Sequence, residues 1–205
     1  MIRLTLLTTI LLVLTGCATL SEEECLVADW YQIGLEDGSL GRSSQWLAKH
    51  RKACAKAGVT PDLAAYEEGH EQGLMRFCNY NNGLGFGLNG AVLPQFCPAP
   101  TRAEFQLGYQ HGLERRQQNQ LINRIASDMD QHHSLIQQHE EDIAYLEAVL
   151  TDDQSSAEER EQALRDMRTL EHNINVLHIE LNDMEQALAI EQHNMELLIQ
   201  GQSYQ

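Results

Sequence analysis

The amino-acid sequence predicts an all-α protein, with a small disulfide-stapled helical head followed by a long antiparallel coiled-coil hairpin. Three observations predict this fold class. Apolar residues recur in steps of three and four through the C-terminal half, four cysteines lie in the half before it, and a glycine motif at helical spacing occurs three times there. Such periods are typical of helices that pack on one face.

Residues 1–16 have the pattern of a removable export signal. Arg3 precedes the apolar stretch 4–14, which is too short to cross a hydrocarbon core of about 30 Å. The stretch ends in Leu14, Thr15, Gly16 and Cys17, a sequence that looks like the lipobox of bacterial lipoproteins. We therefore expect Cys17 to carry the acyl chains that hold the mature protein on a lipid bilayer. The alternative is an ordinary secretory signal with a chance cysteine.

Export would place the other cysteines in an oxidising compartment. Cys25, Cys54, Cys78 and Cys97 are an even number, and four cysteines allow three pairings. We favour Cys25 with Cys54 and Cys78 with Cys97, because each bond then closes a local loop. A zinc site is the competing interpretation, but the cysteines form no closely spaced pair, so we predict no metal and no other cofactor.

The negative charge lies mainly in the C-terminal part. Residues 117–205 contain 18 acids and four arginines, a net charge of -14, whereas residues 17–116 contain 12 acids and nine bases, a net charge of -3. A surface of this sign repels phosphates, so nucleic acid is excluded as a partner.

We expect three segments: the signal peptide (1–16), a lipid-anchored head rich in cysteine and glycine (17–100), and a helix that completes the head and continues into the acidic hairpin (101–205). Pro98 and Pro100 mark the boundary, because two prolines stop a helix that precedes them. Thr101 and Glu104 have the spacing of a capping box that begins the next helix.

A heptad seam predicts the hairpin. Its first arm has the seam positions Ile122, Ile125, Met129, His132, Ile136, His139, Ile143, Leu146 and Leu150. Its second arm has Ala163, Met167, Leu170, Ile174, Leu177, Leu181, Met184 and Leu188. The polar tip 151–156 separates the arms, and Ser156 with Glu159 has the spacing of a second capping box. A short connector makes the arms antiparallel neighbours; pairing between two chains is the alternative.

The glycine motif of the head is an aromatic residue, a glycine three residues later and another glycine four further on. Its copies are Tyr31, Gly34 and Gly38; Tyr66, Gly69 and Gly73; and Phe105, Gly108 and Gly112. These positions share one helix face, and glycine there permits close approach at a cost of about 1 kcal/mol each relative to alanine. We expect three short helices that pack tightly on one another.

Together with the lipobox, Cys54, Phe77, Cys78, Cys97 and Pro98, these copies resemble an uncharacterised family of Gram-negative lipoproteins that is known only as a domain of unknown function. The resemblance covers about residues 29–112 and leaves the hairpin unaccounted for. It implies an envelope location and paired cysteines, and no chemistry.

Three groups of head residues are candidates for function. Asp37, His70 and His111 lie in or beside the motif copies and would form a polar cluster, for acid–base work or metal binding, if the copies converge. The glycine-rich run 81–90 lacks the remaining residues of a phosphate-binding fingerprint, so we expect a disulfide-bounded loop with several positive φ angles.

The third group is basic. Lys49, Arg51, Lys52 and Lys56 lie in a predicted helix over 44–57 that ends at Gly58. They would contact lipid phosphates or the acidic hairpin, or they would simply complement the C-terminal end of the helix dipole.

From these features we expect a lipid-anchored protein at the periplasmic face of the outer membrane that acts as a structural or adaptor protein through its hairpin, with an envelope protein as partner. The alternative is a ligand-binding or regulatory module in the head. An enzyme ranks third, because no residue set in the sequence qualifies as catalytic.

Overall fold

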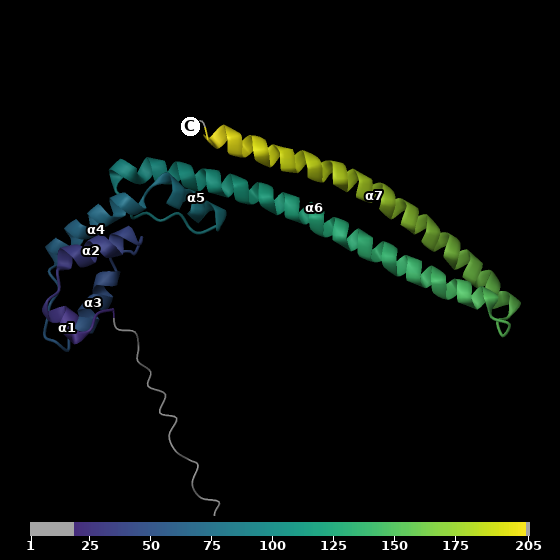
Figure 1. The fold of residues 1–205 in the computed structure, drawn as a ribbon, viewed down its shortest axis with the longest axis horizontal. Helices are drawn as coiled ribbons and strands as arrows, with labels where there is room; N and C mark the ends of the chain where they lie inside the picture. Colours follow the sequence, from purple (N-terminus) through teal and green to yellow (C-terminus); the bar gives the residue numbers. More distant parts are fainter. Residues whose placement is uncertain (1–18, 204–205) are drawn as a thin grey trace, which may run out of the picture. The chain divides into compact units, whose positions relative to one another are not determined.

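The computed structural model describes residues 19–203, and within this range the chain is helical, without strands (Figure 1). The signal segment and Cys17 lie outside the described residues. The helices, in order, are α1 (Glu22–Leu26), α2 (Trp30–Ser39), α3 (Trp46–Cys54), α4 (Leu63–Phe77), α5 (Tyr80–Leu88), α6 (Ala99–Thr151) and α7 (Ala157–Ser203). In the part that the structure describes, no helix is long and apolar enough to span a membrane.

The chain forms two compact units. Unit 1 contains the described residues up to Leu84 together with Val92–Tyr109, and unit 2 contains Gly85–Ala91 with the chain from Gln110 onward. The boundary we expected, at residue 100, therefore falls within unit 1. Helix α6 begins in unit 1 and continues into unit 2 without a break.

Helices α1, α2 and α4 of unit 1 begin at side chains that satisfy some of their first free N–H groups. Ser21 caps α1 in a capping box with Glu24, while the Asp29 and Asp62 carboxylates accept hydrogen bonds from N–H groups of α2 and α4. Acceptors at these positions stabilise a helix start by about 1 kcal/mol each. Short helices thus begin at defined residues, which sets their register against one another.

Both disulfides have the pairing that the sequence favours. Cys25 is bonded to Cys54 and Cys78 to Cys97, and all four cysteines are buried. The first bond joins the ends of α1 and α3, in a core that also contains Trp30, Leu47 and Tyr66. The second bond holds the segment before α6 against the end of α4. Each bond restricts the unfolded chain and so compensates for a small core.

The glycine-rich run is a helix, so our expectation of a loop is wrong. Residues 80–88 form α5, and in the run 81–90 only Gly90 has a positive φ, of 66°. The Asn79 side chain accepts a hydrogen bond from the Asn82 N–H at the start of α5. Tertiary packing of the glycines overrides the low helix propensity of this segment.

The start of α6 also differs from the prediction. The helix begins at Ala99, so Pro100 lies in its first turn, where a missing N–H costs nothing. Thr101 is inside the helix and donates to the Pro98 carbonyl. Glu104 does not close a capping box; its carboxylate accepts the backbone N–H of Tyr80, 3.2 Å away, at the start of α5.

The coiled-coil hairpin is confirmed. Helix α7 returns along α6 (Figure 1), and every predicted seam position is buried or half-buried, with Ile136, Ala163 and Leu181 at 7%, 2% and 5% exposure. The connector contains residues 152–156. The predicted capping box is present: Ser156 Oγ accepts the Glu159 N–H, and the Glu159 carboxylate accepts the Ser156 N–H.

Polar pairs across the hairpin define its register. His132 Nε2 lies 2.9 Å from the Glu180 carboxylate, and its Nδ1 lies 2.9 Å from the Asp128 carbonyl one turn earlier. Near the open end, the buried Gln202 side chain accepts from Arg115 and donates to Glu114. Because these pairs fit only one alignment of the arms, they specify the register that apolar seam residues leave less constrained.

Replacing Ser156 with alanine should lower the free energy of unfolding of the hairpin by about 1 kcal/mol, because it removes the oxygen that caps α7. Thermal unfolding followed by circular dichroism measures the change. Ser155→Ala is the matched control, since it changes the same residue type one position outside the capping box. Equal effects of the two substitutions would contradict the assigned cap.

Candidate functional site

Helices α2 and α4 touch backbone to backbone at their motif glycines. A Cβ added at Gly34 would overlap the Tyr66 carbonyl oxygen, and one added at Gly69 would overlap the Tyr31 carbonyl oxygen. In each copy the first glycine therefore faces the carbonyl of the other copy's aromatic residue. Only glycine permits this approach, in which Cα–H groups face carbonyl oxygens.

The contacts of the second glycines show that α2 and α4 are parallel. A Cβ at Gly38 would meet the His70 carbonyl, and a Cβ at Gly73 would meet the Leu35 carbonyl. From Gly34 to Gly38 the contact thus advances four residues on both helices in the same direction. The two copies lie side by side in equivalent register, as in close-packed pairs with small residues four apart.

Helices α5 and α6 repeat this arrangement. A Cβ at Gly83 would overlap the Phe105 carbonyl oxygen, and one at Gly108 would overlap the Tyr80 carbonyl oxygen. Tyr80, Gly83 and the buried Gly87 are therefore a fourth copy of the motif, which our sequence analysis missed because it treated the run as a loop. The spacing itself was a sufficient signal. Four copies form two pairs, rather than the single three-helix cluster that we expected.

The Asp37 carboxylate lies at the centre of a buried network in unit 1. Asp37 Oδ1 accepts a hydrogen bond from Arg42, at 2.8 Å. Asp37 Oδ2 accepts from Tyr66 Oη at 2.7 Å and from His50 Nε2 at 2.8 Å. The Asp37 side chain is 2% exposed, and those of His50 and Tyr66 are also buried. One carboxylate thereby connects α2, α3 and α4, which are far apart in the sequence.

The network keeps Asp37 ionised. Burial alone would raise its pKa, but the hydrogen bonds from His50, Tyr66 and Arg42 outweigh burial and lower the pKa to about 2. Burial and the adjacent carboxylate raise the pKa of Tyr66, so this phenol stays protonated and remains a donor. At neutral pH Asp37 is therefore an ionised, fully hydrogen-bonded carboxylate and Tyr66 keeps its proton, which suits a structural role better than acid–base catalysis.

His70 extends the network through Arg42 and Tyr66. Its Nε2 lies 2.7 Å from the Arg42 carbonyl, and its ring stacks on Tyr66 with 5.7 Å between ring centroids. The His50 Nδ1 atom is buried without a hydrogen-bond partner. Arg42 is therefore held at both its side chain and its backbone, which fixes the turn between α2 and α3.

The three predicted cluster residues do not form one cluster within a unit. Asp37 and His70 share the network of unit 1, whereas His111 is buried in unit 2. Among the described residues, no group of three His, Cys, Asp or Glu side chains is placed to hold a metal ion. His50, Tyr66 and Arg42 complete the site instead. Their separations from Asp37, of 13, 29 and 5 residues, follow no motif.

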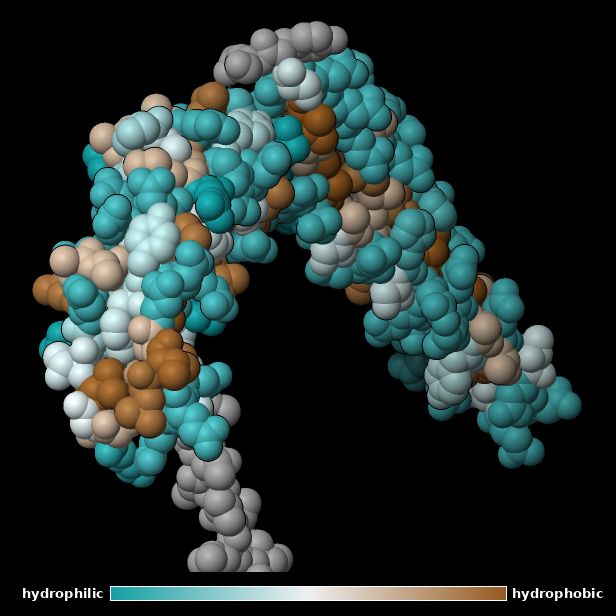
Figure 2. All heavy atoms as spheres, turned by 60° about the vertical axis from the view of Figure 1, so that its left-hand side comes forward, coloured by the Kyte–Doolittle hydropathy of each residue, from teal (hydrophilic) through white to brown (hydrophobic). Residues whose placement is uncertain are grey.

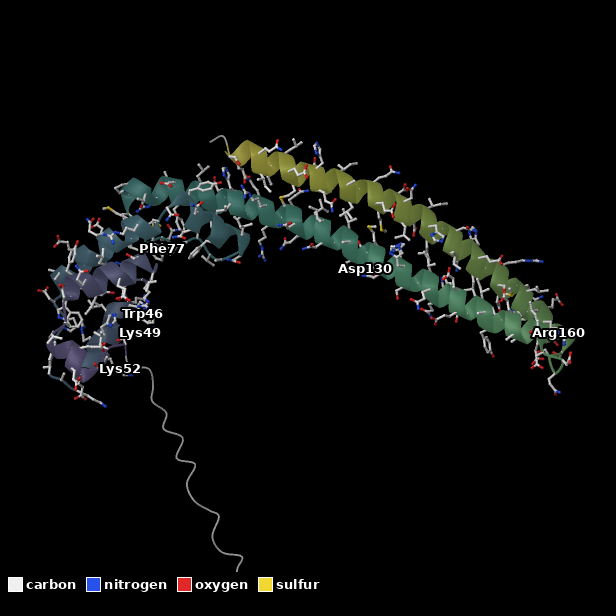
Figure 3. The ribbon with its side chains drawn as sticks, viewed as in Figure 1. Trp46, Lys49, Lys52, Phe77, Asp130 and Arg160 are labelled. Atoms are coloured by element: carbon white, nitrogen blue, oxygen red, sulfur yellow. A yellow bond between two sulfur atoms is a disulfide. The ribbon has the colours of Figure 1, made fainter. Side chains whose placement is uncertain are left out.

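The predicted basic residues lie on or next to α3. Lys49, Arg51, Lys52 and Lys56 are exposed, and α3 ends at Cys54, before the positive φ of Gly58. Lys49 Nζ lies 3.2 Å from the centroid of the Trp46 ring, and the Arg42 guanidinium carbon lies 4.8 Å from it. Figure 3 shows Trp46, Lys49 and Lys52 along one side of this helix. Such stacking orders a lysine that would otherwise be mobile.

Comparison with known proteins found a family match for the head. Residues 29–114 match the family described as "Protein of unknown function (DUF2799)". Neither the curated proteins nor the solved structures gave a match. The matched range contains all four motif copies and Asp37, while nearly all of the hairpin lies beyond it. A DUF2799 domain, a domain of unknown function, therefore covers residues 29–114 of this chain.

Proposed function

We propose that the chain is a lipid-anchored protein of the bacterial cell envelope, and that its coiled-coil hairpin is a structural or adaptor element that binds an envelope protein. The lipobox-like sequence up to Cys17 supports the anchor. The buried Asp37 network, which ties three helices of the head together, supports a scaffold. The observation that carries the adaptor function is a second apolar row on α7.

This row consists of Ile179, Ile190 and Leu197, which we name the outer row. Their exposed fractions are 65%, 60% and 51%. They are 11 and 7 residues apart, close to whole turns of 3.6 residues, so they share a face. Seam residue Leu181, two positions after Ile179, lies about 200° around the helix. The hairpin core therefore does not use the outer row.

The neighbours of the outer row are mostly uncharged, in contrast to the acidic hairpin as a whole. Asn175, Asn182, Gln186 and Asn194 lie on the same side of α7, together with the acidic Asp183. An exposed row of isoleucine and leucine flanked by amides is typical of a surface that a partner helix covers, with large apolar side chains as the anchors. Charged residues would have opposed that contact by their desolvation cost.

A photo-crosslinking amino acid placed at Ile190 in the producing bacterium should give a discrete protein adduct, because this position faces the proposed partner. Tyr145 is the matched control: it is 71% exposed and lies on the outer side of the other arm. Val92, which is 88% exposed, is the control for the head. Ile179→Glu with Ile190→Glu should weaken the purified complex by at least about tenfold, since each removes an apolar anchor.

Adducts from Val92 alone would contradict the adaptor function and move the binding surface to the head. Equal adducts from Ile190 and Tyr145 would contradict the outer row as the specific site. In the double glutamate variant, retained helicity and thermal stability of the hairpin distinguish loss of the partner surface from loss of the fold, because the seam residues are unchanged.

A further inference from the structure

One end of the head exposes large apolar side chains. Leu26 ends α1 and Val27 follows it; they are 68% and 83% exposed, and Leu63, the first residue of α4, is 50% exposed. Because α2 and α4 are parallel with Tyr31 beside Tyr66, residue 63 lies next to the start of α2, just after Val27. The three side chains thus gather at the N-terminal end of this helix pair, where Figure 2 shows hydrophobic surface near α1.

The segment that follows α2 and includes α3 is basic in an otherwise acidic protein. Its α3 helix runs from Trp46, beside Arg42 and the C-terminal part of α2, to Cys54 at this end of the head. Residues 38–61 contain Arg42, Lys49, Arg51, Lys52 and Lys56 and no acid, and the three lysines are the only ones in the chain. Arg42 is bonded to Asp37, which leaves four exposed cations. The Cys25–Cys54 disulfide, with 5.4 Å between the Cα atoms, holds the end of α1 against the end of α3. Val27 and Lys56 each lie two residues from that bond.

We propose that this end of the head, with Leu26, Val27 and Leu63, lies against an anionic phospholipid surface together with the adjoining side of α3 and the turn after it, which carry Lys49, Lys52 and Lys56. Exposed apolar side chains beside lysines suit the boundary between acyl chains and phosphates. An acidic protein would satisfy the lysines but leave the apolar residues in water. Glu22, Glu23 and Glu24 in α1 oppose an anionic surface, so the lysine side of α3, rather than the first turn of α1, faces the lipid.

The course of the chain agrees with this placement. Cys17 is eight residues before Cys25, and an extended chain of eight residues reaches about 28 Å at most. Acyl chains on Cys17 would therefore keep this end of the head near the bilayer. This part of the inference rests on the proposed lipid anchor. The surface contact itself depends on charge and apolar area, which can be measured separately from acylation.

Trp46 provides an intrinsic probe, because it lies under Lys49, whereas Trp30 is 9% exposed. The full-length protein, as processed by the producing bacterium, is mixed with vesicles of brominated phosphatidylglycerol or brominated phosphatidylcholine. Bromine quenches nearby tryptophan, so we expect strong quenching in the anionic vesicles, weaker quenching in the zwitterionic ones, and loss of the difference in Trp46→Phe. The mass of the N-terminal peptide reports whether Cys17 is acylated.

Two variants should each remove the extra quenching in anionic vesicles. One is Val27→Glu, and the other is the triple variant with Lys49→Glu, Lys52→Glu and Lys56→Glu. Val92→Glu is the matched control: Val92 is a similarly exposed valine in the same unit, five residues before Cys97, whose partner Cys78 follows the other end of α4. Any of three results would overturn the proposal: unchanged quenching in the triple lysine variant, an equal loss of quenching with Val92→Glu, or no quenching of the parent protein. An unacylated Cys17 with quenching retained would overturn only the anchor. Circular dichroism and intact disulfides confirm that each variant is folded.

Discussion

Replacing Gly69 with alanine should lower the free energy of unfolding of the head by about 3 kcal/mol or more. The added Cβ would overlap the Tyr31 carbonyl oxygen, a backbone atom that cannot rotate away. Helices α2 and α4 would have to separate, which would also weaken the hydrogen bond from Tyr66 to Asp37 across them. Overpacking against backbone is among the most destabilising changes a core can undergo. Urea unfolding followed by circular dichroism measures the loss.

Gly85→Ala is the matched control. Gly85 lies in α5, yet nothing lies within 4 Å of a Cβ added there, so alanine should stabilise by up to about 1 kcal/mol through its helix propensity. Gly34→Ala combined with Gly69→Ala should cost less than the sum of the single changes, because both separate the same two helices. A Gly69→Ala protein as stable as the parent would contradict the close parallel packing.

Replacing Asp37 with asparagine should cost about 3–5 kcal/mol at neutral pH. The change removes the buried charge and replaces one of the two acceptor oxygens by an NH2 donor, which then faces either Arg42 or the buried pair His50 and Tyr66. Chemical unfolding at pH 7 measures the loss. Asp153→Asn, an exposed position in the hairpin connector, is the control and should change stability by less than about 0.5 kcal/mol.

The same variant should alter the acid sensitivity of the head. Because the pKa of Asp37 is lowered from 3.8 to about 2 on folding, its stabilising contribution, about 2 kcal/mol, is fully present above pH 4 and is lost as the pH falls from about 4 to 2. The stability difference between the parent and Asp37→Asn should therefore shrink over that range. A difference that stays constant down to pH 2 would contradict an ionised, network-bound Asp37.

Local sequence patterns predicted much of the fold and little of the site. The glycine spacing singled out Asp37 and His70, but His50, Tyr66 and Arg42 join Asp37 only after three helices have packed. The run 81–90 was wrongly expected to be a loop because glycine disfavours an isolated helix. Close packing of Gly83 against the Phe105 carbonyl compensates for that cost, and the motif spacing of Tyr80, Gly83 and Gly87 marks the helix face but not the partner helix.

The sequence by itself determined the hairpin, its seam and its capped tip, since a repeat of three and four residues has one helical solution and a short connector makes the arms antiparallel. It also favoured the two disulfides, through the short loops that they close. Only the tertiary structure decided that the motif copies form parallel pairs, that Asp37 binds three partners, and that Leu26, Val27 and Leu63 share one end of the head. These features depend on contacts between residues far apart in the chain, whose register is set by packing rather than by local periodicity.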